Sequence, residues 1–155
     1  MANEHKTVKR ARHKANVAGR ILKSKRRIRR GEESGVVTIG RVREGLSTKV
    51  FKTVAANLEM SDRQLAGVLK IPDRTFDRRL KYGVLSPEES DRLARVAKIL
   101  KRAHQVFGNA EKARGWMNTP LAAFEGETPL QRADTSLGAN QVEEVLGRID
   151  YGVYT

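Results

Sequence analysis

Residues 61–83, SDRQLAGVLKIPDRTFDRRLKYG, decide the fold of this chain. On both sides of Pro72, apolar side chains recur at the spacing of a single helical face. Proline disfavours helical backbone in the residue before it, so Pro72 separates two short helices. The sequence therefore predicts a helix over residues 61–70, a tight turn and a second helix over Asp73–Tyr82, which together form a helix-turn-helix.

The apolar and polar residues of this stretch have different expected roles. The apolar ones lie where the motif needs contacts between its helices: Leu65, Ala66, Leu69, Ile71, Phe76 and Leu80. Arginine near the start of a helix in the major groove reaches guanine edges, whereas Lys and Thr more often hold phosphates. The candidates for DNA contact are Arg63, Gln64, Arg74, Thr75, Arg78, Arg79 and Lys81.

Three residues of this stretch depart from the pattern of the motif. Lys70 stands where such turns usually have glycine, so the turn can differ in detail, and Asp73 and Asp77 interrupt the positive face. A plain helical hairpin with solvated charges is the alternative. Aromatic residues that would stack on unpaired bases are scarce, which favours duplex DNA over RNA.

The flanking sequence also indicates helices. A helical pattern begins at Ser47, and residues 86–107 combine a capping Ser, Pro87 and a capping-box Glu89. A short helix follows Asn109, and the last begins at Ser136; only residues 35–40 have the pattern of a short strand. We expect an all-α protein, with a helix-turn-helix DNA-binding bundle followed by a small helical domain.

Charge is unevenly distributed along the chain. The net charge is +13, yet residues 1–35 hold 12 Lys and Arg against only 3 Asp and Glu. We expect residues 1–40 to be a flexible basic arm, 41–85 the helix-turn-helix and dimerisation region, and 86–155 a second functional domain. The arm is interpreted either as a phosphate-binding segment or as a solubility tail.

Composition argues against several function classes. There is no cysteine, and His5, His13 and His104 do not stand at metal-ligand spacing. No nucleophile motif is present, so we expect neither an enzyme nor a bound cofactor or metal. No apolar run is long enough for a membrane span or a signal peptide, so we expect a cytoplasmic protein with no membrane partner.

From residue 61 to the end, the chain resembles the Xre/MbcA/ParS-type antitoxins, specifically the Xre-like partners of RES-domain toxins. The motifs that carry the resemblance are DRTFDRRL (73–80), LSPEESDRL (85–93), FGNAEKARGW (107–116), TPL (119–121 and 128–130) and GRIDYGV (147–153). The resemblance implies an N-terminal part that binds operator DNA and dimerises. It also implies that residues 86–155 are a C-terminal toxin-binding domain, which covers the active-site cleft of an NAD-depleting toxin.

We therefore expect a type II antitoxin that neutralises a RES-type toxin and represses its own operator. Val142, Val145, Leu146 and Ile149 form an apolar stripe on the last helix that would fill a groove of the toxin. The expected toxin contacts are Trp116, Met117, Val145, Arg148, Ile149, Tyr151, Val153, Tyr154 and Thr155.

A homodimer is expected because one helix-turn-helix makes few DNA contacts. Its expected seam is formed by Val50, Val54 and Leu58 with the long helix over residues 86–107. A free-standing basic helix-turn-helix regulator, or a nucleoid-type protein without a toxin, is the alternative function, followed by an RNA-associated protein.

Overall fold

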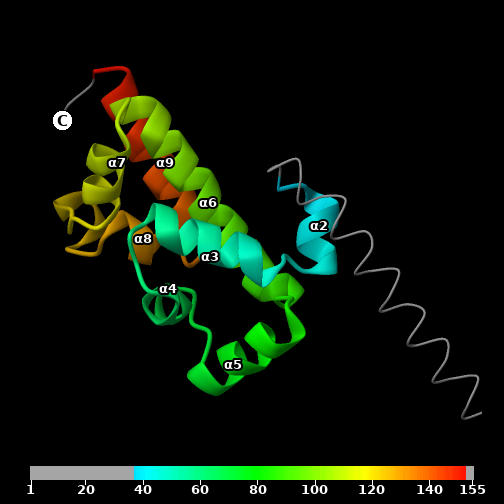
Figure 1. Cartoon of the computed structure of the whole chain (residues 1–155). Coiled ribbons are helices and arrows are strands. Elements are labelled where there is room, and N and C mark those ends of the chain that lie inside the picture. Colours follow the sequence, from blue (N-terminus) through cyan, green and yellow to red (C-terminus); the bar gives the residue numbers. More distant parts are fainter. Residues whose placement is uncertain (1–36, 153–155) are drawn as a thin grey trace, which may run out of the picture. The chain divides into compact units, whose positions relative to one another are not determined.

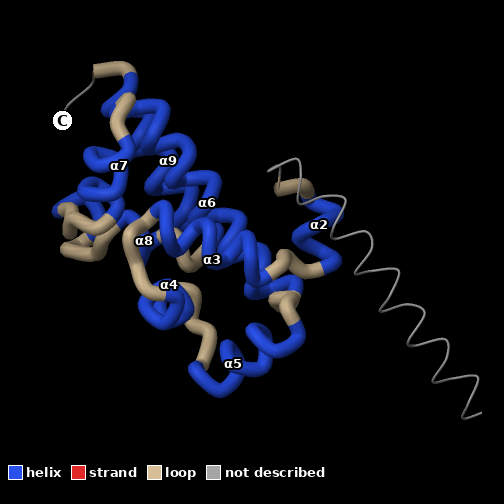
Figure 2. Tube along the Cα trace, viewed as in Figure 1, coloured by secondary structure: helices blue, strands red, loops and turns tan. Residues whose placement is uncertain are grey.

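A computed structural model describes residues 37–152 of the chain. These residues form helices joined by short loops (Figures 1 and 2), and contacts divide the chain into residues 1–41 and 42–155. The second unit holds α3 to α9. The helices are α2 (Ile39–Glu44), α3 (Thr48–Asn57), α4 (Asp62–Val68), α5 (Asp73–Tyr82), α6 (Pro87–Phe107), α7 (Ala110–Met117), η1 (Ala122–Phe124), α8 (Pro129–Arg132) and α9 (Ser136–Asp150).

The helices begin and end at the residues that favour such positions. Ser61, Ser86 and Thr128 each form a reciprocal capping box at the start of α4, α6 and α8. Gly83 and Gly108 end α5 and α6 in left-handed backbone, as glycine readily does. These findings confirm the predicted all-α fold, and they place Ile39, expected in a short strand, inside α2.

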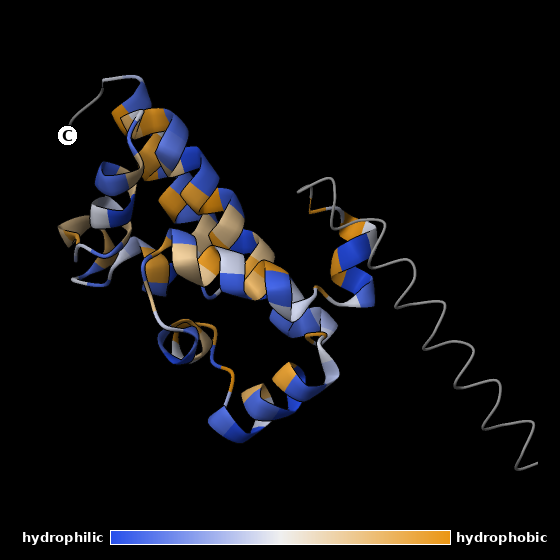
Figure 3. Cartoon of the chain, in the orientation of Figure 1, coloured by the Kyte–Doolittle hydropathy of each residue, from blue (hydrophilic) through white to orange (hydrophobic). Residues whose placement is uncertain are grey.

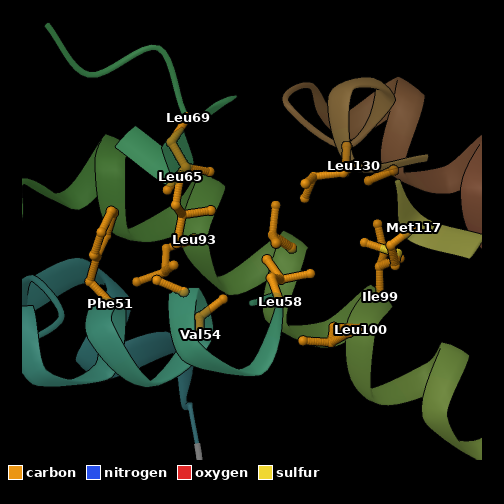
Figure 4. Packing of buried hydrophobic residues seen from close by; sticks show 14 of the residues in the cluster. Phe51, Val54, Leu58, Leu65, Leu69, Leu93, Ile99, Leu100, Met117 and Leu130 are labelled. Atoms are coloured by element: carbon orange, nitrogen blue, oxygen red, sulfur yellow. The ribbon is translucent and has the colours of Figure 1, made fainter. Parts of the chain in front are cut away.

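The helix-turn-helix is held on α3 and α6 by a shared apolar core. Phe51 of α3 and Phe76 of α5 lie with ring centroids 4.9 Å apart, and both are fully buried. Figure 4 shows Phe51 and Leu65 converging on Leu93 of α6. Lys70 occupies the turn with φ 55°, so the left-handed conformation is kept without glycine. Lys70 therefore adopts the left-handed backbone conformation that glycine adopts most readily.

Leu80 is the exception among the six apolar residues predicted to lock the two helices. Five of them are buried, but Leu80 is 36% exposed. Within α5 only Phe76, one helical turn earlier, is buried, so the contact of this helix with the core is made at Phe76 and not at Leu80. The prediction that Leu80 belongs to the core is therefore wrong.

The segment around the helix-turn-helix is closed by backbone hydrogen bonds. The Thr48 amide donates to Gly83 O (3.0 Å), and the Leu85 amide donates to Leu46 O (2.9 Å). Gly45 permits this approach: its φ is +94°, and a Cβ there would lie 2.4 Å from Leu85 O. The start of α3 and the end of α5 consequently meet just before α6.

The C-terminal half is built on α6 and α9, which lie side by side and run in the same direction (Figure 1). Arg95 donates to Asp134 O (2.9 Å), just before α9, while further along Lys98 pairs with Glu143 (2.8 Å). Near the helix ends Arg102 pairs with Asp150 at 2.7 Å. Two adjacent helices that run in the same direction need a long connection between them, and α7, η1 and α8 form this connection.

Candidate functional site

The surface of α5 carries the clearest charged feature of the described residues. Arg74, Arg78 and Lys81 are exposed and follow one another at helical spacing, so they share one face, named here the cationic stripe. None of the three forms an ion pair with another described residue. In Figure 3, α5 is mostly hydrophilic. Thr75, beside the stripe, is half-buried.

Arg63 pairs with both of the acidic residues that interrupt the positive face of α5. Its guanidinium contacts Asp73 at 3.2 Å and Asp77 at 2.5 Å, and it lies 5.7 Å from the centre of the Phe76 ring. The hydrogen bond with Asp77 contributes most to raising the pKa of Arg63. The predicted DNA contact Arg63 therefore has partners within the motif and offsets part of the negative charge on this face, which stays net positive because of the cationic stripe.

Gln64 likewise has a local role. Its side-chain Oε1 accepts from the Ser61 amide at 2.8 Å, while the Ser61 hydroxyl accepts from the Gln64 amide at 3.2 Å. These two bonds satisfy donors at the start of α4 that have no helical partner.

At the start of α6, hydrogen bonds from the backbone amide of Glu88 itself and from Ser86 lower the pKa of Glu88.

Arg79 points away from the cationic stripe toward α6. Its Nε donates to Glu89 Oε2 at 2.7 Å, with the two side chains 23% and 10% exposed. Arg92, one turn along α6, donates to Leu69 O in the turn of the motif at 2.8 Å. From the sequence, Glu89 is predicted only to cap α6, and Arg92 has no predicted contact. No signal in the sequence identifies these two contacts, because the partners of Glu89 and Arg92 lie in other elements of the fold.

The C-terminal helix presents a different face from the one expected. Val142 and Leu146 are fully buried in the chain's own core, so the prediction that they face a partner is wrong. Val145 and Ile149 are half-buried, whereas Arg148 is exposed. Tyr151 follows the helix and is 83% exposed. The exposed surface at this end of α9 is therefore formed by Arg148 and Tyr151, with the edges of Val145 and Ile149.

The remaining predicted toxin contacts differ in exposure. Met117 is fully buried beside Ile99 and Leu130 (Figure 4), so its side chain belongs to the core and its assignment to a partner surface is corrected. Trp116 is half-buried, with its ring 5.7 Å from that of Phe107. The other three predicted contacts lie outside the described residues: Val153, Tyr154 and Thr155.

The expected dimer seam is also changed by burial. Val54 and Leu58 are 6% and 2% exposed, so both pack inside the chain and cannot form a seam as the sequence predicted. Val50 is half-buried.

Within the described residues, no cluster of acidic or histidine side chains is arranged to hold a metal ion. None of the helices in residues 37–152 has the length and apolar character of a membrane span.

Two family models match consecutive parts of the chain. Residues 38–98 match the antitoxin Xre-like helix-turn-helix domain, which contains the cationic stripe. Residues 102–152 match the antitoxin Xre/MbcA/ParS C-terminal toxin-binding domain, which contains α7 to α9. The boundary between the two matches falls within α6.

Several curated relatives carry the name Antitoxin Xre. The protein of Yersinia enterocolitica is 29% identical over 123 residues, which cover 78% of this chain and 83% of the relative. The protein of Pseudomonas putida is 45% identical over 83 residues, covering 53% and 52%. The protein of Photorhabdus laumondii is 29% identical over 112 residues, covering 71% and 76%.

Proposed function

Because this chain belongs to the Xre/MbcA/ParS-type antitoxins, with a helix-turn-helix domain and a toxin-binding domain, we propose that it neutralises a RES-type, NAD-depleting toxin and represses its own operator. The toxin-binding domain argues against a free-standing regulator. Both actions take place in the cytoplasm, where the operator and NAD are found. The proposed partners are the toxin, duplex DNA and a second copy of the chain.

The cationic stripe carries the DNA part of the proposal. Arg74, Arg78 and Lys81 have no acidic partner among the described residues, and Asp73 and Asp77 both pair with Arg63. In a helix-turn-helix, the second helix lies in the major groove, where arginine binds guanine O6 and N7 with two hydrogen bonds. Lys81, at the end of the helix, suits a phosphate.

Replacing Arg78 tests this assignment. We expect Arg78→Ala to weaken binding to the promoter duplex upstream of the chain's own gene by about 1–3 kcal/mol and to relax base preference. Lys101→Ala removes one exposed positive charge from α6 and is the matched control, expected to change affinity little. Fluorescence anisotropy with promoter and scrambled duplexes measures both. Unchanged promoter affinity of Arg78→Ala would show that α5 does not read the operator.

The end of α9 carries the toxin part of the proposal. Gly152, with φ 69°, leads the chain out of the helix beside the exposed Tyr151. Aromatic anchors with a charged neighbour are common at the centre of protein interfaces, and Arg148 supplies the charge here. The residues that follow Gly152 would then enter the toxin cleft and cover the site where NAD binds.

Removing residues 151–155 tests the toxin contact while keeping the ion pair of Asp150 with Arg102. In cells that also produce the neighbouring RES-type toxin, we expect NAD to fall as it does without antitoxin. Tyr82→Ala, which truncates another exposed tyrosine (66%), should protect NAD fully. Melting temperature and promoter binding of the truncated protein should stay unchanged. Full protection by the truncated chain would place the inhibitory contact elsewhere, with Trp116 the next candidate.

A further inference from the structure

Glu89 occupies an unusual position, between the start of α6 and the recognition helix α5. Its Oε2 accepts two hydrogen bonds, from the Ser86 amide (2.7 Å) and from Arg79 Nε (2.7 Å). The residue is 8% exposed, so both bonds lie largely out of water. Charge-assisted bonds of this kind are shorter and stronger than neutral ones. One carboxylate therefore joins α5 to α6.

The capping of α6 does not require Arg79. Ser86 and Glu89 already satisfy each other's backbone amides, and Pro87 stands in the first turn. What the contact with Arg79 adds is a fixed rotation of α5 about its axis. Consecutive helical residues are about 100° apart, so holding Arg79 against α6 turns its neighbour Arg78 outward.

We propose that Arg79 and Glu89 are a positioning pair that orients the cationic stripe, and that Arg79 is not itself a DNA contact. The inference rests on the proposed DNA binding. It replaces the sequence-based assignment of Arg79, which was made from its charge and its place on the helix. Arg92, whose guanidinium donates to Leu69 O at 2.8 Å, holds the turn of the motif to the same end of α6.

The substitution Glu89→Gln distinguishes a positioning role from a purely electrostatic one, because the two roles predict opposite changes in DNA affinity. Glu89→Gln removes a negative charge near a DNA-binding helix, and long-range electrostatics alone would then strengthen binding to a polyanion. The glutamine amide keeps an oxygen that can accept from the Ser86 amide, as Gln does in other capping boxes. If Glu89 positions α5, the same substitution weakens binding to the promoter.

A double-mutant cycle in the full chain tests the proposal, using Glu89→Gln, Arg79→Gln and both together. Each single substitution should lower affinity for the promoter duplex by about 5- to 10-fold, and the double substitution should lower it no further, as expected for two coupled groups. Affinity for a scrambled duplex should stay within about 2-fold, because no phosphate contact is removed. Glu143→Gln, which breaks the pair with Lys98 on the distant part of α6, is the matched control and should leave both affinities unchanged.

The possible results are distinguishable. Arg79→Gln leaves the capping box intact, so it tests the pair even if Glu89→Gln melts below the assay temperature. Promoter binding by Glu89→Gln that equals or exceeds wild type overturns the proposal, as does an Arg79→Gln variant that loses promoter and scrambled DNA alike. A wild-type chain that does not prefer the promoter would instead remove the proposed DNA function, and the role of the pair with it.

Discussion

Lys70 closes the turn between α4 and α5 in a backbone conformation that side chains disfavour. Its φ is 55°, and its amide donates to Gly67 O at 3.1 Å. Left-handed backbone costs a residue with a side chain roughly 1–2 kcal/mol. Glycine avoids this cost, but it loses more conformational entropy on folding, so replacing the residue by glycine recovers only part of the energy. Lys70 is exposed, with no described ion pair to offset this cost.

We therefore expect Lys70→Gly to raise the free energy of unfolding by about 0.5–1 kcal/mol. Lys52→Gly makes the same chemical change at an exposed position within α3 and should lower it by about 1 kcal/mol. Urea denaturation followed by circular dichroism measures both. A loss of stability in Lys70→Gly would mean that the lysine side chain makes a compensating contact.

At the scale of the helix, two glycines in α9 have opposite surroundings. A Cβ on Gly138 would lie 1.9 Å from Arg132 O at the end of α8, whereas one on Gly147 would meet nothing within 4 Å. Because the obstacle is backbone, side-chain rotation cannot relieve it. The absence of a side chain at residue 138 is what lets the first turn of α9 pack against α8.

Alanine at the two positions should therefore have opposite effects. We expect Gly138→Ala to lower the free energy of unfolding by about 1–3 kcal/mol, through displacement of α9. Gly147→Ala should raise it by up to about 1 kcal/mol, because alanine favours helix. Thermal denaturation of the two variants is the measurement. Equal melting temperatures would show that Gly138 does not lie in close contact with Arg132 O.

The helices themselves were predictable because their signals are local. Ser86, Pro87 and Glu89 start α6, Gly108 ends it, and each acts within a few residues of its own position. Periodicity cannot say what a helical face contacts. Val142 and Leu146 have the same pattern whether they meet a toxin or the chain's own core.

The contacts of the candidate site were harder to predict for a related reason. Arg79 pairs with Glu89 only because α6 returns beside α5, and Arg63 reaches Asp77 only across the turn. An arginine that pairs within the fold and one that faces solvent look alike in sequence. Arg74, Arg78 and Lys81 remain predicted DNA contacts.

For the whole molecule, the association state is the first property to measure. Two-fold dimers give a helix-turn-helix protein two half-sites about 34–36 Å apart, which one copy cannot contact. We expect light scattering at micromolar concentration and moderate salt to give twice the chain mass of 17.4 kDa. A mass of one chain under these conditions would contradict the dimer, whose seam cannot include Val54 or Leu58.

The hydrogen bonds that join the two ends of residues 46–85 have a practical meaning for exchanging this segment between related proteins. The Thr48 amide donates to Gly83 O and the Leu85 amide donates to Leu46 O, so the segment begins and ends at neighbouring positions in the fold. A graft with junctions there needs no new linker to span a distance. The grafted segment would still need residues that hydrogen-bond to Glu89, Ser90 and Arg92 of α6. Operator choice and toxin choice would then be transferable traits, inherited separately by chimeric chains.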